Sequence, residues 1–262
     1  MITRIALPPP YAPSGHPPQR TGAPLRFVCP GILSFWVLNR ASEQGGTVLT
    51  TGTEDYYRER APEYDQVYAK LERQTDLRAI RAWLPDVLRG RRVLDVASGT
   101  GYWTGVFAEH AAFVLATDVN DATLEVARNR REWPSHVQFA TADAFHLDPV
   151  PGDFNAAFVG FFWSHLPLAS LDLFLSGLFG RLDNDSVVVF MDNRYVEGSN
   201  HPIVRTDDQG NSFQRRTLQS GTEWEVLKNF PSLEVLKSTL ERYAPNVIVH
   251  CWDYYWAATC ST

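Results

Sequence analysis

The sequence predicts an α/β fold with a doubly wound, mostly parallel β-sheet, helices on both faces and a β-hairpin inserted after the fifth strand. Two observations predict it. From Arg92 onward, short apolar runs alternate with segments of helical periodicity, which is typical of repeated strand–helix units. These runs are continuously apolar rather than alternating, as parallel strands covered on both faces should be.

Composition sets the class of protein. The chain has 262 residues, with 44% hydrophobic and 21% charged, which fits one globular domain and a tail. A net charge of −6 without a basic block argues against nucleic acid as the main partner. No run approaches the roughly 18 apolar residues of a membrane-spanning helix, so no membrane partner is expected. The three cysteines are widely spaced, which predicts a reducing, cytoplasmic setting.

The start of the chain differs from the rest. Eight of the 17 prolines fall within the first 30 residues, and no acidic residue precedes Glu43. Residues 1–46 are therefore predicted to form a disordered leader, and residues 47–262 a single domain. Two alternatives stay open: a mitochondrial-type transit peptide, and a translation start at Val48 or Leu49 that would exclude the leader.

The ordered elements are expected to begin near Thr53. Tyr57, Tyr64 and Tyr68 recur at helical spacing, with Pro62 as a kink or break. A second helix is predicted from about Thr75 to Leu88, or two short helices because Pro85 interrupts the pattern. Five strands and three intervening helices should follow: strands Val93–Ala97, Phe113–Asp118, Val137–Thr141, Ala156–Phe162 and Val187–Asp192; helices Tyr102–His110, Asp121–Arg131 and Leu168–Leu182.

The alternation ends after Asp192. Two short runs, Ile203–Asp207 and Ser212–Leu218, flank a turn sequence and predict the inserted hairpin. Helices are expected at Thr222–Asn229 and Ser232–Ala244. The chain should close with Val247–His250 and Tyr254–Cys260, as two strands or as one long bent strand.

The most informative stretch runs from Asp95 to Gly101, with the sequence Asp-Val-Ala-Ser-Gly-Thr-Gly. An apolar strand leads into a loop where glycines permit close backbone approach, and a helix follows, as in Rossmann-like nucleotide sites. Asp118 ends the next strand, 23 residues after Asp95, where a carboxylate can hold the hydroxyls of a ribose. A dinucleotide site would need a third glycine, but Tyr102 stands there.

This stretch resembles motif I of the class I S-adenosylmethionine-dependent methyltransferases, in which an acid precedes x-G-x-G-x-G. Ala97 replaces the first glycine, and the position is expected to need only a small residue. Further along the chain the similarity is positional, and it is greatest to small bacterial methyltransferases of the ubiquinone and menaquinone type. The resemblance implies S-adenosylmethionine as cofactor and a small-molecule methyl acceptor. It implies these cofactor-binding residues: Asp95, Ala97, Ser98, Gly99, Gly101, Asp118, Val119, Asp143, Ala144 and Gly160.

His165 is the candidate general base. It follows the fourth strand of the alternation, whose end faces the methyl donor in the family, and an imidazole with a pKa near 6–7 can accept a proton at neutral pH. A helix-capping or buried structural histidine is the alternative. Six residues are expected to line the acceptor pocket, either before the first strand of the alternation or near the ends of its fourth and fifth strands. They are Tyr57, Tyr64, Trp163, Asp192, Asn193 and Arg194. Core packing is the alternative for each aromatic residue among them.

Four arginines surround the predicted hairpin and offer a site for a carboxylate or phosphate of the acceptor, or else a solvated face: Arg194, Arg205, Arg215 and Arg216. No metal is expected, because Gly160 stands where metal-assisted methyltransferases carry an acid. The sequence therefore predicts methyl transfer to nitrogen, oxygen or sulfur of a small molecule. A nicotinamide-dependent oxidoreductase and a non-catalytic nucleoside-binding regulator are the alternatives.

Overall fold

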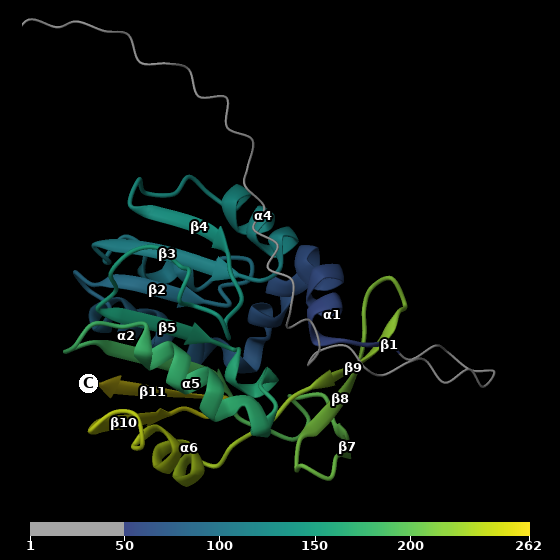
Figure 1. Cartoon of the computed structure of the whole chain (residues 1–262). Coiled ribbons are helices and arrows are strands. Elements are labelled where there is room, and N and C mark those ends of the chain that lie inside the picture. Colours follow the sequence, from purple (N-terminus) through teal and green to yellow (C-terminus); the bar gives the residue numbers. More distant parts are fainter. Residues whose placement is uncertain (1–49) are drawn as a thin grey trace, which may run out of the picture. The chain divides into compact units, whose positions relative to one another are not determined.

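The computed structural model describes residues 50–262, and two β-sheets organise them (Figure 1). The predicted leader, residues 1–46, lies outside the described residues. The larger sheet has seven strands in the order β10-β11-β6-β5-β2-β3-β4. Their bounds are β2 Arg92–Val96, β3 Phe113–Asp118, β4 Val137–Thr141, β5 Ala156–Gly160, β6 Val187–Asn193, β10 Asn246–Cys251 and β11 Tyr255–Ser261.

The predicted doubly wound sheet is confirmed. Strands β2 to β6 pair in parallel, and β11 runs antiparallel to both of its neighbours. The chain adds β3 and β4 on one side of β2 and then returns to add β5 and β6 on the other. The strand order thus reverses between β2 and β5, and ligands of such sheets bind at the carboxyl ends next to this point. The last two runs are separate strands, β10 and β11.

Helices cover both faces of this sheet. Helices α5 (Leu171–Gly180) and α6 (Leu233–Leu240) share one hydrophobic cluster with the sheet and lie in front of it in Figure 1. Helices α2 (Gln74–Val87) and α3 (Thr104–Phe107) belong to a cluster on the opposite face. Adjacent strand residues divide between the clusters, with Val93 in one and Leu94 in the other, so each strand is buried on both sides.

Helix α2 confirms the single helix expected over about residues 75–88, while other helix bounds differ from the expectations. The single helix α2 runs through Pro85, because this proline lies in the last turn and removes one hydrogen bond only. Helix α3 is shorter than predicted, and short 3-10 helices, η3 (Trp163–His165) and η4 (Leu168–Ser170), precede α5. Helix α4 spans Asp121–Asn129. Between residues 50 and 262, no helix is long and apolar enough to cross a bilayer.

The segment before α2 changes helix type where a break is predicted. Helix α1 (Thr53–Arg60) gives way to the 3-10 helix η1 (Ala61–Ala69), with Pro62 in its first turn, and η2 (Leu71–Arg73) follows. The change confirms the break at Pro62. It carries α1 towards the small sheet, so Tyr56 packs edge-on against Trp224 with ring centroids 6.0 Å apart.

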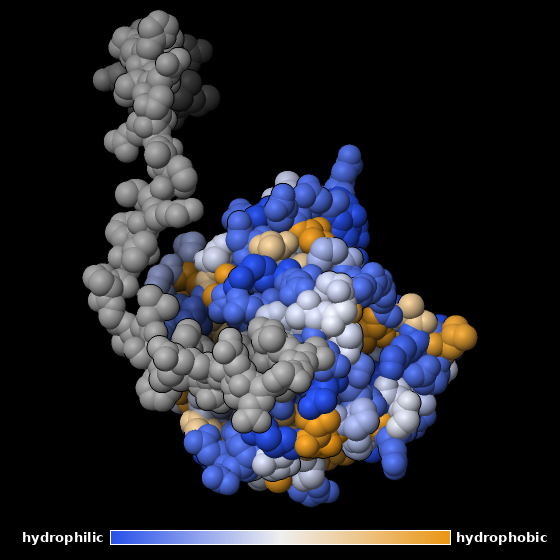
Figure 2. All heavy atoms as spheres, turned by 90° about the vertical axis from the view of Figure 1, so that its right-hand side faces the viewer, coloured by the Kyte–Doolittle hydropathy of each residue, from blue (hydrophilic) through white to orange (hydrophobic). Residues whose placement is uncertain are grey.

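The smaller sheet has the order β1-β9-β8-β7, with bounds β1 Thr50–Thr51, β7 Ile203–Thr206, β8 Ser212–Thr217 and β9 Glu223–Leu227. The antiparallel pair β7–β8 confirms the inserted hairpin. The helix predicted over Thr222–Asn229 is wrong, because this segment contains β9. Trp224 and Val226 alternate with more exposed neighbours, which is a period of two and a strand pattern. The face with α1 and this sheet is largely hydrophilic, with small separate hydrophobic patches (Figure 2).

Candidate active site

The carboxyl ends of four parallel strands bring most of the predicted site residues to one edge of the large sheet (Figure 1). Asp95 lies in β2 and Asp118 ends β3. Gly160 ends β5, and Asp192 lies in β6. Residues far apart in sequence therefore meet at the point where the strand order reverses, as expected for a ligand site in a doubly wound sheet.

The loop after β2 has an unusual backbone. Ala97, Gly99 and Gly101 adopt φ angles of 55°, 57° and 70°. A side chain at Gly101 would meet the Cβ atom of Ala127 at 3.0 Å, so glycine lets helix α4 pack closely. At Gly99 a Cβ atom would meet nothing within 4 Å, so this part of the loop faces open space. The small residue expected at position 97 is thus also in a left-handed conformation, which favours glycine.

Asp118 is fixed by backbone amides. Its Oδ2 accepts a hydrogen bond from the Gly99 amide at 2.9 Å, and its Oδ1 accepts one from the Asn120 amide at 2.8 Å. Burial raises the pKa of Asp118, and both hydrogen bonds oppose that rise. A carboxylate can accept about four hydrogen bonds, so acceptor capacity remains for a ribose hydroxyl. The carboxylate and the open loop beside it therefore fit a nucleoside.

Asp95 is a different kind of acid. It is buried beneath the loop, and Thr104 donates a hydrogen bond to its Oδ2 at 2.6 Å. Burial raises its pKa to about 7, against the opposing hydrogen bond. A nearby cation favours the charged form of a buried carboxyl, so this position suits a cationic or zwitterionic ligand.

The other predicted cofactor residues lie around this loop. Ser98 Oγ is buried and has no hydrogen-bond partner among the described residues, which leaves it available to a polar ligand. Gly160 is required sterically, because a Cβ atom there would come within 2.7 Å of the Phe158 ring. Val119 is 48% exposed, and Asp143 is exposed after β4, with Ala144 half-buried beside it. An exposed apolar side chain and a carboxylate beside a nucleoside site are suited to an adenine ring.

Helix η1 lies over the loop. Tyr64 and Tyr68 of η1 line a cavity of about 30 Å³ together with Asp95, Gly99 and other residues of the loop. This volume is one water molecule's share of the liquid. Asp65 ties η1 to the loop: Thr100 Oγ1 donates to its Oδ1 at 2.7 Å, and Arg130 donates to its Oδ2. Tyr64 and Tyr68 therefore border the candidate cofactor site, and the Asp65 contacts hold their helix against the loop.

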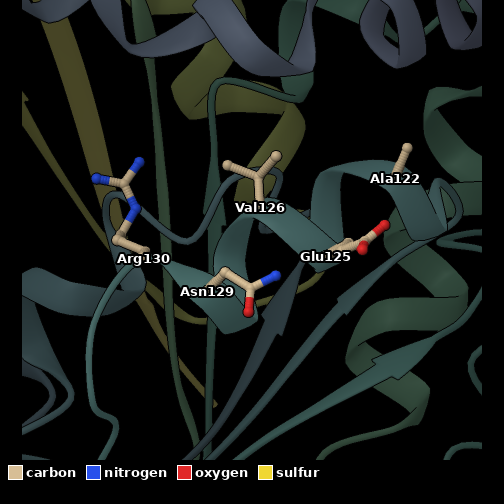
Figure 3. Close-up of a pocket in the computed structure, with 5 residues that line it drawn as sticks. All are labelled: Ala122, Glu125, Val126, Asn129 and Arg130. Carbon is tan, nitrogen blue, oxygen red and sulfur yellow. The ribbon is translucent and has the colours of Figure 1, made fainter.

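A second hollow lies on the outer face of α4. Its volume is about 480 Å³, and Figure 3 shows the five residues that line it: Ala122, Glu125, Val126, Asn129 and Arg130. It contains neither a histidine nor any predicted site residue. Its larger volume therefore does not make it the better candidate, and the edge of the sheet remains the site.

His165 lies beside the aromatic residues of α1. Its Nδ1 is 2.8 Å from the carbonyl oxygen of Leu227, so Nδ1 carries the proton and Nε2 has the free lone pair. The Tyr57 hydroxyl donates to this Nε2 at 2.7 Å. Burial, with the charges of Lys228 and Arg216, lowers the pKa of His165 well below its usual value. The expected pKa near 6–7 is therefore wrong, and the imidazole is neutral at neutral pH.

The sequence analysis missed Lys228. Its Nζ donates to Ser164 Oγ, and it lies 3.2 Å from Asp192 Oδ1 and 3.3 Å from His165 Nε2. Burial lowers its pKa to about 8, although Asp192 opposes that shift. Once the segment is known to be a strand, the period of two puts Trp224, Val226 and Lys228 on one face, which places the lysine on the buried side.

The residues predicted to bind the acceptor separate into two groups. Tyr57 and Tyr64 lie together with ring centroids 5.6 Å apart. Asp192 is connected to them by Lys228, which contacts both Asp192 and His165, the partner of Tyr57. By contrast, Trp163 packs against Phe190 and Trp256 in the core. The Asn193 oxygen accepts from Arg73, and Arg194 donates to backbone carbonyls of Trp252 and Asp253. The structure thus brings Tyr57, Tyr64 and Asp192 into one region. It places Trp163, Asn193 and Arg194 in contacts with other parts of the protein.

Comparisons with known proteins agree with this geometry. A family model described as a methyltransferase domain matches residues 93–185. The solved structure of a DhpI–SAH complex is 30% identical, with a TM-score of 0.62, and the match covers 79% of this chain and 94% of that one. A DhpI–SAM–HEP complex is 28% identical with a TM-score of 0.64 and the same coverage.

Curated relatives match over shorter stretches. A demethylmenaquinone methyltransferase of Clavibacter sepedonicus is 38% identical over 72 residues, which is 28% of this chain and 29% of that protein. A ubiquinone/menaquinone biosynthesis C-methyltransferase of Azotobacter vinelandii is 38% identical over 84 residues, 30% of this chain and 33% of that protein. The chain therefore spans about a third of the length of these relatives.

Proposed function

The chain belongs to the class I S-adenosylmethionine-dependent methyltransferases and uses S-adenosylmethionine as its cofactor, and from this we propose that it methylates a nitrogen, oxygen or sulfur atom of a small molecule. One observation carries the proposal. Tyr64 lines the cavity above the glycine loop and is packed against Tyr57, which donates a hydrogen bond to His165. A histidine nitrogen that accepts the Tyr57 hydrogen bond thus lies two aromatic rings from the cofactor loop.

The residues of this chain have separate roles towards the cofactor. Asp118 holds the ribose hydroxyls with both carboxylate oxygens, while Val119 and Asp143 face the adenine ring. Asp95, beneath the loop, supplies the negative charge that favours the cationic end of the molecule. When bound, S-adenosylmethionine supplies an electrophilic methyl group on a positively charged sulfur.

The acceptor binds on the other side of Tyr64, among Tyr57, His165 and Lys228. Orientation of the acceptor atom and exclusion of water by the tyrosines account for much of the rate in such a site. His165 Nε2 accepts the proton of a hydroxyl, thiol or ammonium acceptor, either directly or through the Tyr57 hydroxyl. The Leu227 carbonyl keeps the Nδ1 proton in place, so Nε2 remains the accepting atom.

Calorimetry and turnover test the proposal together. The protein should bind S-adenosylmethionine and S-adenosylhomocysteine and should not bind NAD with comparable affinity. With a panel of small hydroxyl, thiol and amine compounds, it should convert the cofactor to S-adenosylhomocysteine in a compound-dependent manner. Tighter binding of NAD would favour the oxidoreductase alternative. Cofactor binding without turnover on any compound would favour the nucleoside-binding regulator.

A further inference from the structure

Several cationic side chains gather above His165, and two of them pair with no carboxylate among residues 50–262. Arg216, in β8, is one. Its Nη2 donates to Gln214 Oε1 at 2.9 Å, and its Nη1 lies 3.5 Å from the Tyr56 hydroxyl. Its Nε is buried and has no hydrogen-bond partner in the described part of the chain. An unpaired buried donor is unfavourable, so this nitrogen is suited to an acceptor supplied by a ligand.

Arg60, at the end of α1, is the second unpaired cation. Its guanidinium lies over the rings of Tyr64 and Tyr56, at 5.0 Å and 5.5 Å from their centroids. The Arg216 guanidinium also lies near this group, 5.8 Å from the centroid of the Tyr56 ring. The two arginines, from distant parts of the chain, therefore share Tyr56 as a neighbour.

Their charges are not neutralised locally. Arg216 and Arg60 both act on His165, Lys228 and His201, and in each case they disfavour the protonated form. Two acids of this region have other partners. Asp192 accepts from Lys228 and Ser164, and Glu72 accepts from Ser199. Like charges held together in a partly buried site destabilise the fold unless an anion joins them.

The position of this cluster connects it to the acceptor. Tyr64, over which Arg60 lies, lines the cofactor cavity, and Tyr57 lies next to Tyr64 and reaches His165. An anion between the two arginines would thus lie beside the reacting group, which makes it part of the acceptor rather than a separate effector.

We propose that the methyl acceptor carries an anionic group, a carboxylate or a phosphoryl oxyanion, which binds to Arg216 and Arg60. This proposal rests on the proposed function. A planar guanidinium presents paired N–H donors that match the oxygens of either anion, and two guanidiniums can hold one such group from both sides. Arg216 and Arg60 are then the specificity-determining residues of the site.

The alternative is purely structural: both arginines stack on Tyr56 and hold α1 against β8. Anion binding separates the two explanations. Protein saturated with S-adenosylhomocysteine is titrated with inorganic phosphate and with acetate, and chloride keeps the ionic strength constant. Both the dissociation constant and the rise in melting temperature are measured. One of these anions should bind, and the stronger one identifies the class of group.

The variants are Arg216→Gln and Arg60→Gln, with Arg215→Gln as the matched control. Arg215 is the neighbouring, exposed residue of the same strand. Arg216→Gln should weaken anion binding about tenfold or more, as expected for loss of a charge-assisted contact. Arg215→Gln should leave it unchanged. If Arg216→Gln does not fold, Arg216→Lys is used instead. It keeps the positive charge but lacks the paired N–H donors, so it should show a smaller loss of anion affinity.

Paired acceptors provide a second measurement. Small hydroxy acids and phosphomonoesters should be methylated faster than their neutral esters, and Arg216→Gln should remove this preference. The proposal is overturned if the unmodified protein binds S-adenosylhomocysteine but neither anion. It is also overturned if Arg215→Gln and Arg216→Gln lose equal affinity, or if neutral esters are turned over equally well. Failure to bind S-adenosylhomocysteine would instead reject the proposed function, and the same anion titration of the protein alone would then show whether Arg216 and Arg60 bind an anion.

Discussion

The two halves of the site differ in charge and in how the chain builds them. The half proposed to bind the cofactor contains two carboxylates, Asp95 and Asp118, which lie 23 residues apart in adjacent strands. The acceptor half gathers cations from α1, β8 and the end of β9, with Arg60, Arg216 and Lys228 as its charged groups. One half therefore suits a cationic molecule and the other an anionic one, and the tyrosines of α1 and η1 lie at their boundary.

This separation has a chemical consequence. When the anionic group is itself the nucleophile, methyl transfer turns the sulfonium into a neutral thioether and removes one negative charge from the acceptor. When a hydroxyl, thiol or amine is methylated instead, the anionic group keeps its charge and serves to orient the acceptor. The separation of charge also makes the two halves separable by mutation. Substitutions in the acceptor half should change turnover without changing cofactor affinity. Substitutions in the cofactor half should change cofactor affinity and leave turnover at saturating cofactor largely unchanged.

The largest effect is expected at His165. His165→Ala should lower the methylation rate by roughly 10²–10⁴-fold, the usual loss when a general base is removed, with cofactor affinity unchanged. Burial and the neighbouring cations lower the pKa of His165 well below its usual value, so the imidazole is neutral at neutral pH. The rate of the unmodified protein should therefore show no rise with pH through the usual histidine range that is due to His165. Stopped assays at several pH values check both points.

The control for this variant is Tyr57→Phe, which keeps the ring beside His165 and removes only the hydroxyl. It should lower the rate if the proton passes through Tyr57 and should leave it unchanged if His165 acts directly. A folded His165→Ala variant with nearly full rate would remove His165 from the mechanism. In that case the acceptor's own anionic oxygen would be the nucleophile, because such an atom needs no base.

The second prediction concerns the cofactor half. Asp118→Ala should weaken S-adenosylmethionine binding by about 1–3 kcal/mol, the scale of losing charge-assisted hydrogen bonds. Saturating cofactor should restore much of the turnover, since Asp118 contacts no group of the acceptor half. Calorimetry measures the affinity, and Asp143→Ala, at the exposed side of the same half, provides a weaker comparison. Unchanged affinity in Asp118→Ala would contradict its assignment to the ribose.

The two halves of the site also differ in how well they can be predicted from the sequence. The cofactor half follows from a local pattern, a strand, a loop with two glycines and an acid at a fixed distance, so Asp95, Gly99 and Asp118 lie together as expected. The acceptor half depends on contacts between distant segments, which no local pattern records. Arg60 was not singled out, because nothing near it in sequence indicates that it meets β8.

Lys228 was missed because the secondary structure predicted for its segment is wrong. The segment around Trp224 was predicted to be helical, and in a helix Lys228 has no reason to face inward. As a strand with a period of two, the same residues place Lys228 beside Asp192 and His165. In such a short apolar run, periodicity alone does not distinguish a helix from a strand. The segment is identified as the strand β9 only by its antiparallel pairing with β8.

A third, smaller effect is expected at the boundary between the halves. Asp65→Ala removes the contacts that hold η1 to Thr100 and Arg130, so Tyr64 and Tyr68 should move away from the loop more easily. Loss of hydrogen bonds to a charged group should speed release of S-adenosylhomocysteine about tenfold. Stopped-flow displacement measures that rate, and Glu63→Gln, on the same helix but next to Gln219, is the control. Equal release rates would show that η1 does not limit access.

The smallest effect tests the one position where the cofactor half departs from its family's pattern. Ala97 has a φ angle of 55°, and a left-handed conformation costs a residue with a side chain about 1–2 kcal/mol. Ala97→Gly removes this strain but gives the unfolded chain more freedom, which offsets about 0.4–1 kcal/mol of the gain. The variant should therefore unfold at slightly higher denaturant concentration, with cofactor affinity unchanged. Ala79→Gly, at an exposed position of α2, should be destabilising by about 1 kcal/mol, because there glycine relieves no strain. If both variants lose stability equally, the conformation of Ala97 is not strained, and the alanine is as good a residue as glycine in this loop.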